Sequence, residues 1–238
     1  MNEFSWSDHP SQTAFPIARP GYFIIFVSAF VTTIFALCDM ELIAIVALLI
    51  TLFICAFFRD PDRAVPVEEN AVVSPADGKI IKADIVEDTS YLNGQCLKIS
   101  IFMSVFNVHV NRVPHEGVVK KVIYFPGKFF NASFDKASTE NERNAIIVET
   151  KGGQQYAFVQ IAGLIARRII SRLQINDTIV RGRRFGMICF GSRLDVYLPV
   201  GTKLNVSMGD KVSAGTTILG YLSEVKQAEV NLAGANLA

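Results

Sequence analysis

The stretch that decides the fold reads RFGMICFGSRLDVYLP and spans residues 184–199. Its apolar residues are typical of a buried strand, and Gly191 and Ser192 interrupt them. Glycine adopts backbone angles closed to other residues, so Gly191 could present its carbonyl carbon to the Ser192 hydroxyl. Attack there would move the acyl group from nitrogen to oxygen, break the chain and leave a carbonyl group at the new terminus. Most Gly-Ser pairs, however, form only turns or bulges.

Short apolar stretches divided by glycines surround this segment. We expect strands at residues 71–74, 78–86, 95–103, 117–126, 145–149, 155–161, 187–190, 194–198, 203–206, 211–212 and 217–221. Many short strands with turn residues between them are typical of a sandwich or a barrel. Residues 207–215 have the turn pattern of barrel-sandwich hybrid domains, and only residues 162–172 read as an amphipathic helix. The predicted fold class is therefore α+β and β-rich, with a barrel-sandwich-like domain.

Two apolar runs without charged residues precede the β-rich part. Residues 21–38 read GYFIIFVSAFVTTIFALC, and residues 42–58 read LIAIVALLITLFICAFF. At about 1.5 Å per residue, each run has roughly the length needed to cross a hydrocarbon core of about 30 Å. Buried core helices would normally keep one polar face, and a signal peptide would not be followed at once by a second apolar run. We therefore predict a two-helix transmembrane hairpin.

The charges that flank the apolar runs predict their orientation. Arg19 precedes the first run, Arg59 and Arg63 follow the second, and the connector carries only Asp39 and Glu41. The positive-inside rule then places both ends of the hairpin in the cytoplasm. The predicted organisation is a lead-in at residues 1–20, a hairpin at 21–58 and a domain at 59–238.

Composition argues against several other classes of protein. The 238 residues carry a net charge of +1, which gives no electrostatic case for nucleic-acid binding. The four cysteines are Cys38, Cys55, Cys96 and Cys189, and none forms a Cys-x-x-Cys pair. We therefore expect neither a metal site nor a disulfide framework.

His109 and Asp77 are the candidate acid–base residues. His109 lies in FMSVFNVHVNRVP, where strand alternation would place Asn107, His109 and Asn111 on one face. The plainer interpretation of His109 is a buried core histidine. Asp77 lies in SPADGK, where it is either a turn residue or an acid that orients a histidine.

Two groups of arginines are candidate lipid contacts. The expected helix carries arginines at positions 167, 168 and 172, which are either solvated charges or contacts to anionic lipid. A second group comprises Arg181, Arg183 and Arg184, and one of these could hold a lipid phosphate.

Taken in order, the motifs resemble the phosphatidylserine decarboxylase family in its short membrane-anchored form. The resemblance covers about residues 59–222. It rests on FFRDPDR at 57–63, SPADGKI at 74–80, FMSVFNVHVNRVP at 102–114, YFPGKF at 124–129, NERN at 141–144, QIAGLIARRI at 160–169 and FGSRLDVYLP at 190–199. Each motif is weak alone, but their joint occurrence in this order is highly specific.

The resemblance implies a proenzyme that makes its own cofactor. Ser192 would attack the Gly191 carbonyl, and the resulting ester would eliminate to release residues 1–191 as a large chain. Hydrolysis of the dehydroalanine left at position 192 would release ammonia and give a covalent pyruvoyl group. Residues 192–238 would form the small chain, held to the large one by a shared sheet.

The resemblance also implies the reaction and its place in the cell. The amine of phosphatidylserine in the membrane would form a Schiff base with the pyruvoyl group, lose carbon dioxide and yield phosphatidylethanolamine. His109 matches the family's general acid. The enzyme would act at the inner cell membrane with its catalytic domain on the cytoplasmic side. Assembly into a homo-oligomer is a further option.

One position departs from the family pattern. Longer relatives carry a second histidine three residues after the first, where it acts with the aspartate and the serine in self-cleavage, and this chain has Arg112 there. Asp77, Gly191 and Ser192 carry over directly, whereas the base for maturation is open. Our hypothesis is that His109 serves both steps, with His115 as the lesser candidate.

Two other functions compete with this interpretation. A related self-processing enzyme could act on a different amino-lipid. A non-catalytic membrane adaptor could use the same fold, although an adaptor has no need of NERN, His109 and FGSR together. An uncleaved chain with an ordinary serine at position 192 would favour the adaptor.

Overall fold

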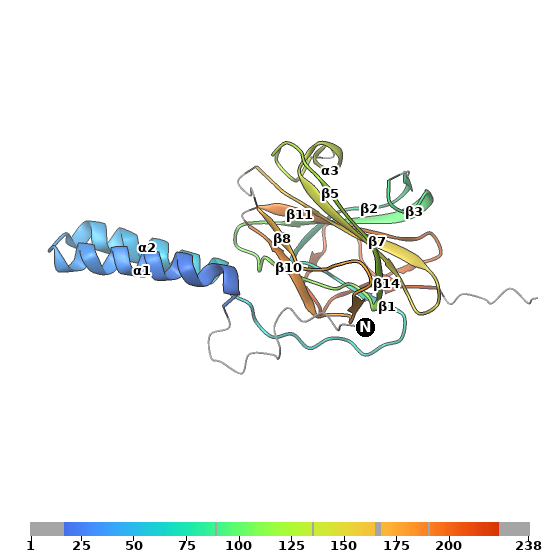
Figure 1. Cartoon of the computed structure of the whole chain (residues 1–238), viewed down its shortest axis with the longest axis horizontal. Coiled ribbons are helices and arrows are strands. Elements are labelled where there is room, and N and C mark those ends of the chain that lie inside the picture. Colours follow the sequence, from blue (N-terminus) through green and yellow to red (C-terminus); the bar gives the residue numbers. More distant parts are fainter. Residues whose placement is uncertain (1–16, 89, 135, 165–167, 190, 224–238) are drawn as a thin grey trace, which may run out of the picture.

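A computed structural model describes residues 17–88, 90–134, 136–164, 168–189 and 191–223. A helical hairpin projects from a β-rich body (Figure 1). A short 3₁₀ turn, η1 (Arg19–Gly21), leads into α1 (Tyr22–Leu37), and α2 (Glu41–Phe57) returns beside it. Three residues at positions 38–40 connect the helices, with Asp39 in the left-handed region at a φ of 56°. The expected pair of antiparallel helices is therefore present.

Polar contacts join the two helices of the hairpin. The Thr51 hydroxyl lies 2.7 Å from that of Ser28 and 3.0 Å from that of Thr32. Hydroxyl groups between apolar helices commonly hold membrane helices together, because each finds its partner inside the helix pair.

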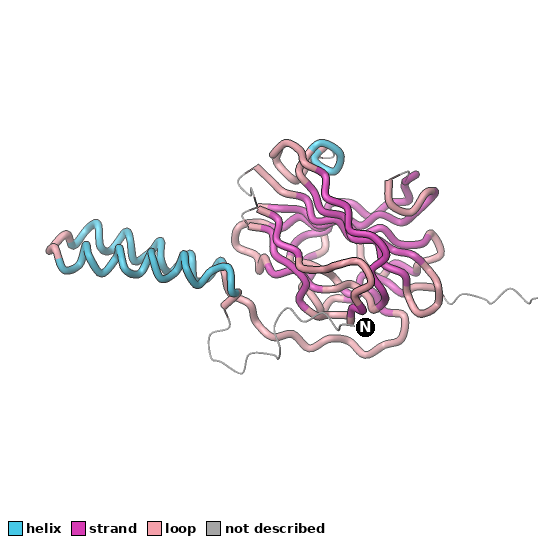
Figure 2. The backbone as a smooth tube through the Cα atoms, in the orientation of Figure 1, coloured by secondary structure: helices cyan, strands magenta, loops and turns pink. Residues whose placement is uncertain are grey.

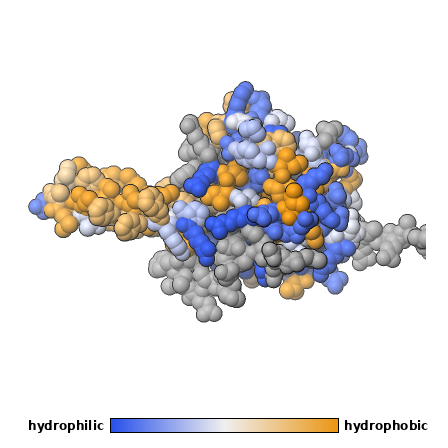
Figure 3. All heavy atoms as spheres, viewed as in Figure 1, coloured by the Kyte–Doolittle hydropathy of each residue, from blue (hydrophilic) through white to orange (hydrophobic). Residues whose placement is uncertain are grey.

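The outer surface of the hairpin is almost wholly apolar (Figure 3). No residue of α1 is buried, and Phe23 and Leu37 are 76% and 80% exposed. Residues Arg19–Leu37 form one helical segment that is long and apolar enough to cross a membrane by length and composition, whereas Glu41–Phe57 is apolar but shorter. The apolar N-terminal helix is a weak hint of membrane association.

The β-rich body is built on one curled sheet that forms a half-barrel (Figure 2). Its strand order is β13 (Lys211–Val212), β2 (Gly78–Asp88), β3 (Gly94–Met103), β11 (Ser192–Pro199), β7 (Gln155–Ile161), β6 (Arg143–Glu149), β5 (Gly117–Phe125) and β9 (Thr178–Ile179). Neighbouring strands are antiparallel. The predicted β-rich class is confirmed.

Two small sheets complete the body. One contains β1 (Ala71–Val73), β14 (Ile218–Tyr221) and β12 (Lys203–Leu204), and the other contains β4 (Val110–Arg112), β10 (Arg184–Ile188) and β8 (Ile169–Ser171). One further short helix is α3 (Ala137–Glu140). Most predicted strands appear within a few residues of their expected bounds, whereas β4, β8 and β9 were not predicted as such.

The prediction of an amphipathic helix at residues 162–172 is wrong over its described part. Residues 162–164 are not helical, and Ile169–Ser171 form β8. Ile169 pairs with Ile188 and Ile170 with Met187 on β10. Because β-branched residues fit a paired strand well, tertiary pairing overrides the local helical pattern here. Arg167 lies outside the described residues.

The stretch at residues 184–199 does form the centre of the fold. β11 lies between β3 and β7, and seven of its eight residues are buried. Leu194, Val196 and Leu198 face the main core, whereas Tyr197 faces a second cluster on the other side of the sheet. Apolar residues at every second position of β11 therefore face the main core, whereas its other face carries the buried Arg193 and Asp195 beside Tyr197.

Shortening a buried side chain of the main core should lower the stability of the fold. Phe158 on β7 is fully buried, and its ring centroid lies 4.8 Å from that of Phe185 on β10. We expect Phe158→Ala to lower the free energy of unfolding by about 3–5 kcal/mol, because it removes apolar contacts and leaves a cavity. Urea unfolding of the two proteins in the same detergent measures this loss. A change within experimental error would contradict the assigned core.

The end of the hairpin nearest the body, its foot, contains Ala18, Phe57 and Phe58 and packs against the body. The backbone N–H of Ala18 donates to the carbonyl of Phe58 at 2.8 Å, which brings the two ends of the hairpin together. One buried cluster then joins hairpin and body: Ala18, Phe57, Phe58, Val108, Val110 and Met187. The apolar helices therefore end directly against the segment that carries His109.

Three arginines tie the following linker, residues 59–70, to the body. Arg184 pairs with Asp60 and Asp62, each at 2.7 Å. Arg181 donates to the carbonyl of Glu68 at 2.7 Å and pairs with Glu116 at 3.6 Å. Arg112 donates to the carbonyl of Pro61 at 2.9 Å. Arg181 and Arg184, two of the candidate phosphate contacts, are therefore engaged in structural interactions.

Candidate active site

Ser192 begins β11 and is fully buried. It lies opposite Met103, the last residue of β3, and its hydroxyl donates to the Met103 sulfur at 3.4 Å. A thioether is a weak acceptor. The serine hydroxyl is thus fixed between two strands but is not held by a strong partner.

Gly191 adopts the conformation that the sequence predicted. Its φ is +62°, in the left-handed region that glycine enters at little cost. A Cβ built on Gly191 would have no atom within 4 Å, so the backbone angle, not lack of space, requires glycine. Phe190, the preceding residue of the quoted motif, lies outside the described residues.

His109 lies at the foot of the hairpin, with its ring centroid 4.2 Å from that of Phe57. The residue is fully buried, and its Nδ1 lies 2.8 Å from the carbonyl oxygen of Asn107. A carbonyl accepts only, so Nδ1 carries the proton and Nε2 carries a lone pair. Within the described residues Nε2 has no hydrogen-bond partner. The ring therefore offers a free basic nitrogen in a buried site.

Burial lowers the pKa of His109 to about 4. The loss of hydration is the main cause, the hydrogen bond to the Asn107 carbonyl opposes it, and the positive charge of Arg59 adds to it. At neutral pH the imidazole is therefore uncharged.

The predicted polar stripe on one strand face is wrong, because β4 begins only at Val110 and Asn107 lies in a turn. The Asn107 side chain accepts from the backbone N–H and the hydroxyl of Ser104, at 2.9 and 2.8 Å. Ser104 directly follows Met103, the strand partner of Ser192. Asn107 therefore links His109 to Ser104, which follows the end of β3. The turn in this way fixes the position of His109 relative to Met103, the strand partner of Ser192.

Asp77 lies in the same region but is engaged elsewhere. One carboxylate oxygen accepts from the backbone N–H of Ala214 at 2.7 Å, and the other pairs with Arg63 at 2.9 Å. Asp77 directly precedes β2, which is separated from β11 by β3, so about 10 Å separates the two strands. The structure brings Asp77 to the region of Ser192 but not into contact with it.

His115 lies away from Ser192. Its Nδ1 lies 2.9 Å from the carbonyl oxygen of Ala71, and its ring packs edge-on against Tyr156 at 6.1 Å. Tyr156 precedes Ile161 by five residues, and Ile161 is the strand partner of Arg193. About 16 Å of strand therefore separates Tyr156 from the level of Arg193, and the Gly-Ser pair lies further along in the same direction.

Arg112, at the position of the family's second histidine, has a structural environment. Besides its contact with Pro61 it donates to the carbonyl of Gly182 at 3.0 Å. The pKa of Arg112 is lowered to about 10, mainly by burial and also by the positive charge of Arg184, while Asp60 opposes the shift. Arg112 therefore keeps its proton at neutral pH and cannot act as a base.

Acid should destabilise the protein through His109. Because the folded pKa of about 4 lies below the ordinary 6.5, the unfolded chain takes up the proton first as pH falls. The contribution of the neutral His109 to the free energy of unfolding is complete above pH 6.5 and is lost between pH 6.5 and 4. At pH 5 the loss is about 2 kcal/mol. Urea unfolding of wild type and His109→Gln at pH 7.5 and 5 tests this. Equal losses in the two proteins would contradict a buried neutral histidine.

A row of buried amides lies beside the site, and the sequence did not indicate that its members contact one another. The Gln160 side chain donates to Asn111 at 2.9 Å and accepts from Asn144 at 3.3 Å, and all three are buried. The amide of Asn111 points at the sulfur of Met103 at 3.8 Å. The sequence pointed to Asn111 as part of a polar face and to Asn144 and Gln160 only as members of two motifs.

A buried ion pair follows Ser192 on the other face of β11. Arg193 lies 2.6 Å from Asp195 and donates to the Ser100 hydroxyl at 2.8 Å, and both charged residues are fully buried. Lys98 lies 3.1 Å from the second Asp195 oxygen. These contacts fix the first residues of β11 to β3.

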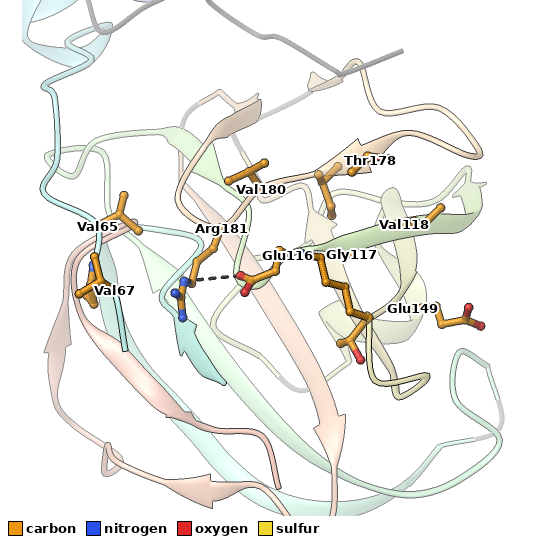
Figure 4. Close-up of a pocket in the computed structure, with 13 residues that line it drawn as sticks. Val65, Val67, Glu116, Gly117, Val118, Glu149, Thr178, Val180 and Arg181 are labelled. Atoms are coloured by element: carbon orange, nitrogen blue, oxygen red, sulfur yellow. Dashed lines mark ion pairs between the residues drawn. The ribbon is translucent and has the colours of Figure 1, made fainter. Parts of the chain in front are cut away.

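A pocket of about 730 Å³ lies away from these residues (Figure 4). Its wall includes Val65, Val180, Gly117 and Glu149, with Arg181 and Glu116 pointing toward one another. Glu149 ends β6, whereas the opposite end of β6 adjoins the level of Ser192. The pocket therefore does not contain the candidate catalytic residues.

Comparison with known proteins places the chain in a family. Residues 50–220 match the family described as phosphatidylserine decarboxylase. A phosphatidylserine decarboxylase proenzyme from Desulfotalea psychrophila is 51% identical over 211 residues, 89% of this chain and 99% of the relative. Proteins of the same name from Paraburkholderia xenovorans and Geotalea uraniireducens are 50% and 51% identical, each over 87% of this chain and 97% of the relative.

Proposed function

The chain belongs to the phosphatidylserine decarboxylase family, and we propose that it converts phosphatidylserine to phosphatidylethanolamine with a pyruvoyl group made from its own Ser192. The observation that carries this proposal is the pair at the start of β11. Gly191 holds a left-handed angle beside a buried serine whose hydroxyl, within the described residues, donates to a sulfur. The name proenzyme, carried by the relatives, is consistent with a precursor that is cut.

The proposed maturation uses only residues of this chain. Ser192 Oγ attacks the Gly191 carbonyl carbon, the C–N bond breaks, and the hydroxyl proton goes by way of His109 Nε2 to the freed nitrogen. Loss of the Cα proton then breaks the Cβ–O bond of the ester, which releases Gly191 as a carboxylate and leaves dehydroalanine. Water replaces its nitrogen, and ammonia leaves.

The surroundings of residue 192 fit a pyruvoyl group. When present, that group supplies an electrophilic ketone for the substrate amine and an electron sink for the electron pair left by carbon dioxide. His109 supports this role, since a neutral Nε2 in a buried site can take a proton from the substrate ammonium. It can then return one to the carbon that loses carbon dioxide. A substrate carboxylate near His109 would favour its protonated form and aid that return.

The sheet would keep the two chains together after the cut. β11 pairs with β3 at eight positions and with β7 at five, and both partners belong to the large chain. β13 and β14, also in the small chain, pair with β2 and β1. The proposed small chain would thus keep four strand pairings with the large chain besides the core contacts.

We propose that α1 and α2 both cross the membrane and that the body lies on the cytoplasmic side. The exposed apolar surface of the hairpin and the arginines at its ends support this orientation. Residues 1–20, 21–58 and 59–238 would then be lead-in, anchor and catalytic domain. His109 packs on Phe57 at the foot of the anchor, so a lipid head group would meet it where the bilayer ends.

We propose that His109 serves both maturation and turnover and that Asp77 assists maturation. The distance of His115 from the Gly-Ser pair supports His109 over His115. Asp77 is bound to Arg63 of the linker, so its carboxylate would act on the site only when that ion pair opens. Asp77→Asn should slow the appearance of the small chain on a gel, and Arg63→Gln should not. Equal cleavage rates in wild type and Asp77→Asn would remove Asp77 from the mechanism.

The reaction itself is tested with a labelled lipid. Liposomes of phosphatidylserine labelled at the serine carboxyl carbon should release labelled carbon dioxide and accumulate phosphatidylethanolamine. Self-cleavage without such release would favour an enzyme for another amino-lipid. An uncleaved chain that binds the liposomes without turnover would favour the adaptor.

A further inference from the structure

Two glycines meet at the proposed cleavage point for different reasons. Gly191 needs its left-handed angle and has free space on its Cβ side. Gly163 is not among the residues with positive φ, yet a Cβ built on it would overlap the Gly191 carbonyl oxygen and lie 2.9 Å from the carbonyl carbon. Gly163 is therefore a glycine because the Gly191 carbonyl occupies the space of a side chain.

The strand register explains this close approach. Arg193 on β11 lies opposite Ile161 on β7, and the strands run antiparallel. Two residues further along, this register places Gly191 opposite Gly163. The backbone of residue 163 thus forms a wall against the carbonyl group that Ser192 would attack.

A buried asparagine fixes that wall. The Asn141 amide donates to the carbonyl of Ala162 at 2.7 Å, and the carbonyl of Glu142 accepts from the Ala162 N–H at 2.9 Å. Asn141 is itself held by Phe130, whose carbonyl accepts from its amide at 2.8 Å and whose N–H donates to its oxygen at 2.9 Å. Both backbone groups of the residue before Gly163 are therefore fixed, and Asn141 is fully buried.

We propose that Asn141, Ala162 and Gly163 form a carbonyl clamp that holds the Gly191 carbonyl in place for attack by Ser192. Asn141 and Gly163 are its positioning residues. The clamp rests on the proposed self-cleavage and assigns a role within it to the NERN and QIAGL motifs. It acts before the C–N bond breaks and takes no proton itself.

The physical advantage of the clamp is restricted motion. A peptide group beside a glycine samples many orientations, and only some present the carbonyl carbon to the next residue's hydroxyl. Attack requires an approach of about 3–3.5 Å with aligned orbitals, and a misplacement of about 1 Å can cost about 100-fold in rate. A wall of backbone, itself fixed by buried hydrogen bonds, limits the carbonyl to the productive side.

Gly163→Ala tests the clamp directly. The added methyl group must displace the Gly191 carbonyl, so we expect cleavage of the precursor to slow by about 100-fold or more. The matched control is Gly117→Ala, whose added Cβ would also overlap a backbone carbonyl oxygen, that of Glu149, at the far end of the sheet. Pulse-chase labelling followed by gel electrophoresis gives both rates, and melting temperatures show whether each variant folds.

Asn141→Ala provides a second variant if Gly163→Ala does not fold. It removes the fixed hydrogen bond to Ala162 and should slow cleavage by about 10-fold or more, as expected for a partly displaced carbonyl. Tyr156→Phe is its control, because it also removes a buried hydrogen bond to a backbone carbonyl, that of His115. Its precursor should be cleaved at the wild-type rate even if its melting temperature falls.

Hydroxylamine identifies the step that is slowed. Under mild conditions it cleaves an ester far more readily than a peptide bond, so a precursor blocked after the acyl shift would split after residue 191. A cut at the Asn93–Gly94 bond, which hydroxylamine can also attack, would give fragments of a different size. Both clamp variants should remain intact, because the clamp acts before the ester forms. Wild-type cleavage rates in folded Gly163→Ala and Asn141→Ala, or hydroxylamine-sensitive precursors, would overturn the clamp. A wild-type chain that is never cut before Ser192 would instead overturn the proposed function.

Discussion

Replacing Ser192 by alanine should leave a single uncleaved chain that releases no carbon dioxide from phosphatidylserine. The methyl group cannot attack the Gly191 carbonyl, and alanine cannot supply the oxygen that leaves during elimination. The stability should change little, since in the part of the chain that the structure describes the lost hydroxyl donates to the Met103 sulfur, a weak acceptor. Gel electrophoresis shows the chains, and trapping of labelled carbon dioxide measures turnover, which we expect to fall to background.

Ser171→Ala is the matched control for this variant. It also removes a buried hydroxyl, one that has no hydrogen-bond partner within the described part of the chain. It lies on β8 and should be cleaved and active like wild type. Normal cleavage of Ser192→Ala would contradict the self-cleavage mechanism.

Replacing His109 by alanine should have the second largest effect. Loss of a positioned acid–base group typically costs about 100- to 10,000-fold in rate, and we expect losses in this range for both cleavage and decarboxylation. The two steps share the free Nε2 in our account. The rate of precursor cleavage and the rate of carbon dioxide release per cleaved chain measure them separately.

The outcomes of the histidine experiment separate the two roles. His115→Ala is the control, because His115 contacts Ala71 and Tyr156 rather than the Gly-Ser pair. It should be cleaved at close to the wild-type rate. If His109→Ala is cleaved normally but is inactive, its maturation role is excluded; if His115→Ala is the variant that fails to cleave, the assignment is reversed.

The sequence predicted the β-rich body well because its signals are local. Apolar runs bounded by glycines and turn residues delimit strands such as β7 and β11 in the sequence itself. Residues 162–172 show the limit of this reasoning, because Ile169 and Ile170 fit a helical pattern but pair with β10. A pattern within one segment carries no information about the strand that lies beside it.

Only those features of the candidate site that depend on a single segment were predictable. The Gly191 angle followed from its residue type, whereas the packing of His109 on Phe57 joins segments that lie far apart in the chain. The engagement of Arg184 by Asp60 is equally long-range, which is why a structural arginine resembled a phosphate contact. The closeness of Gly163 to the Gly191 carbonyl required the strand register and had no signal of its own.

The mass spectrum of the intact purified protein tests the central claim most directly. Our account predicts two polypeptides, one ending at Gly191 and one that begins at position 192. The smaller should be lighter by one ammonia than the peptide released by simple hydrolysis, and it should resist Edman degradation. Active protein that consists of one chain with an unmodified Ser192 would contradict the account.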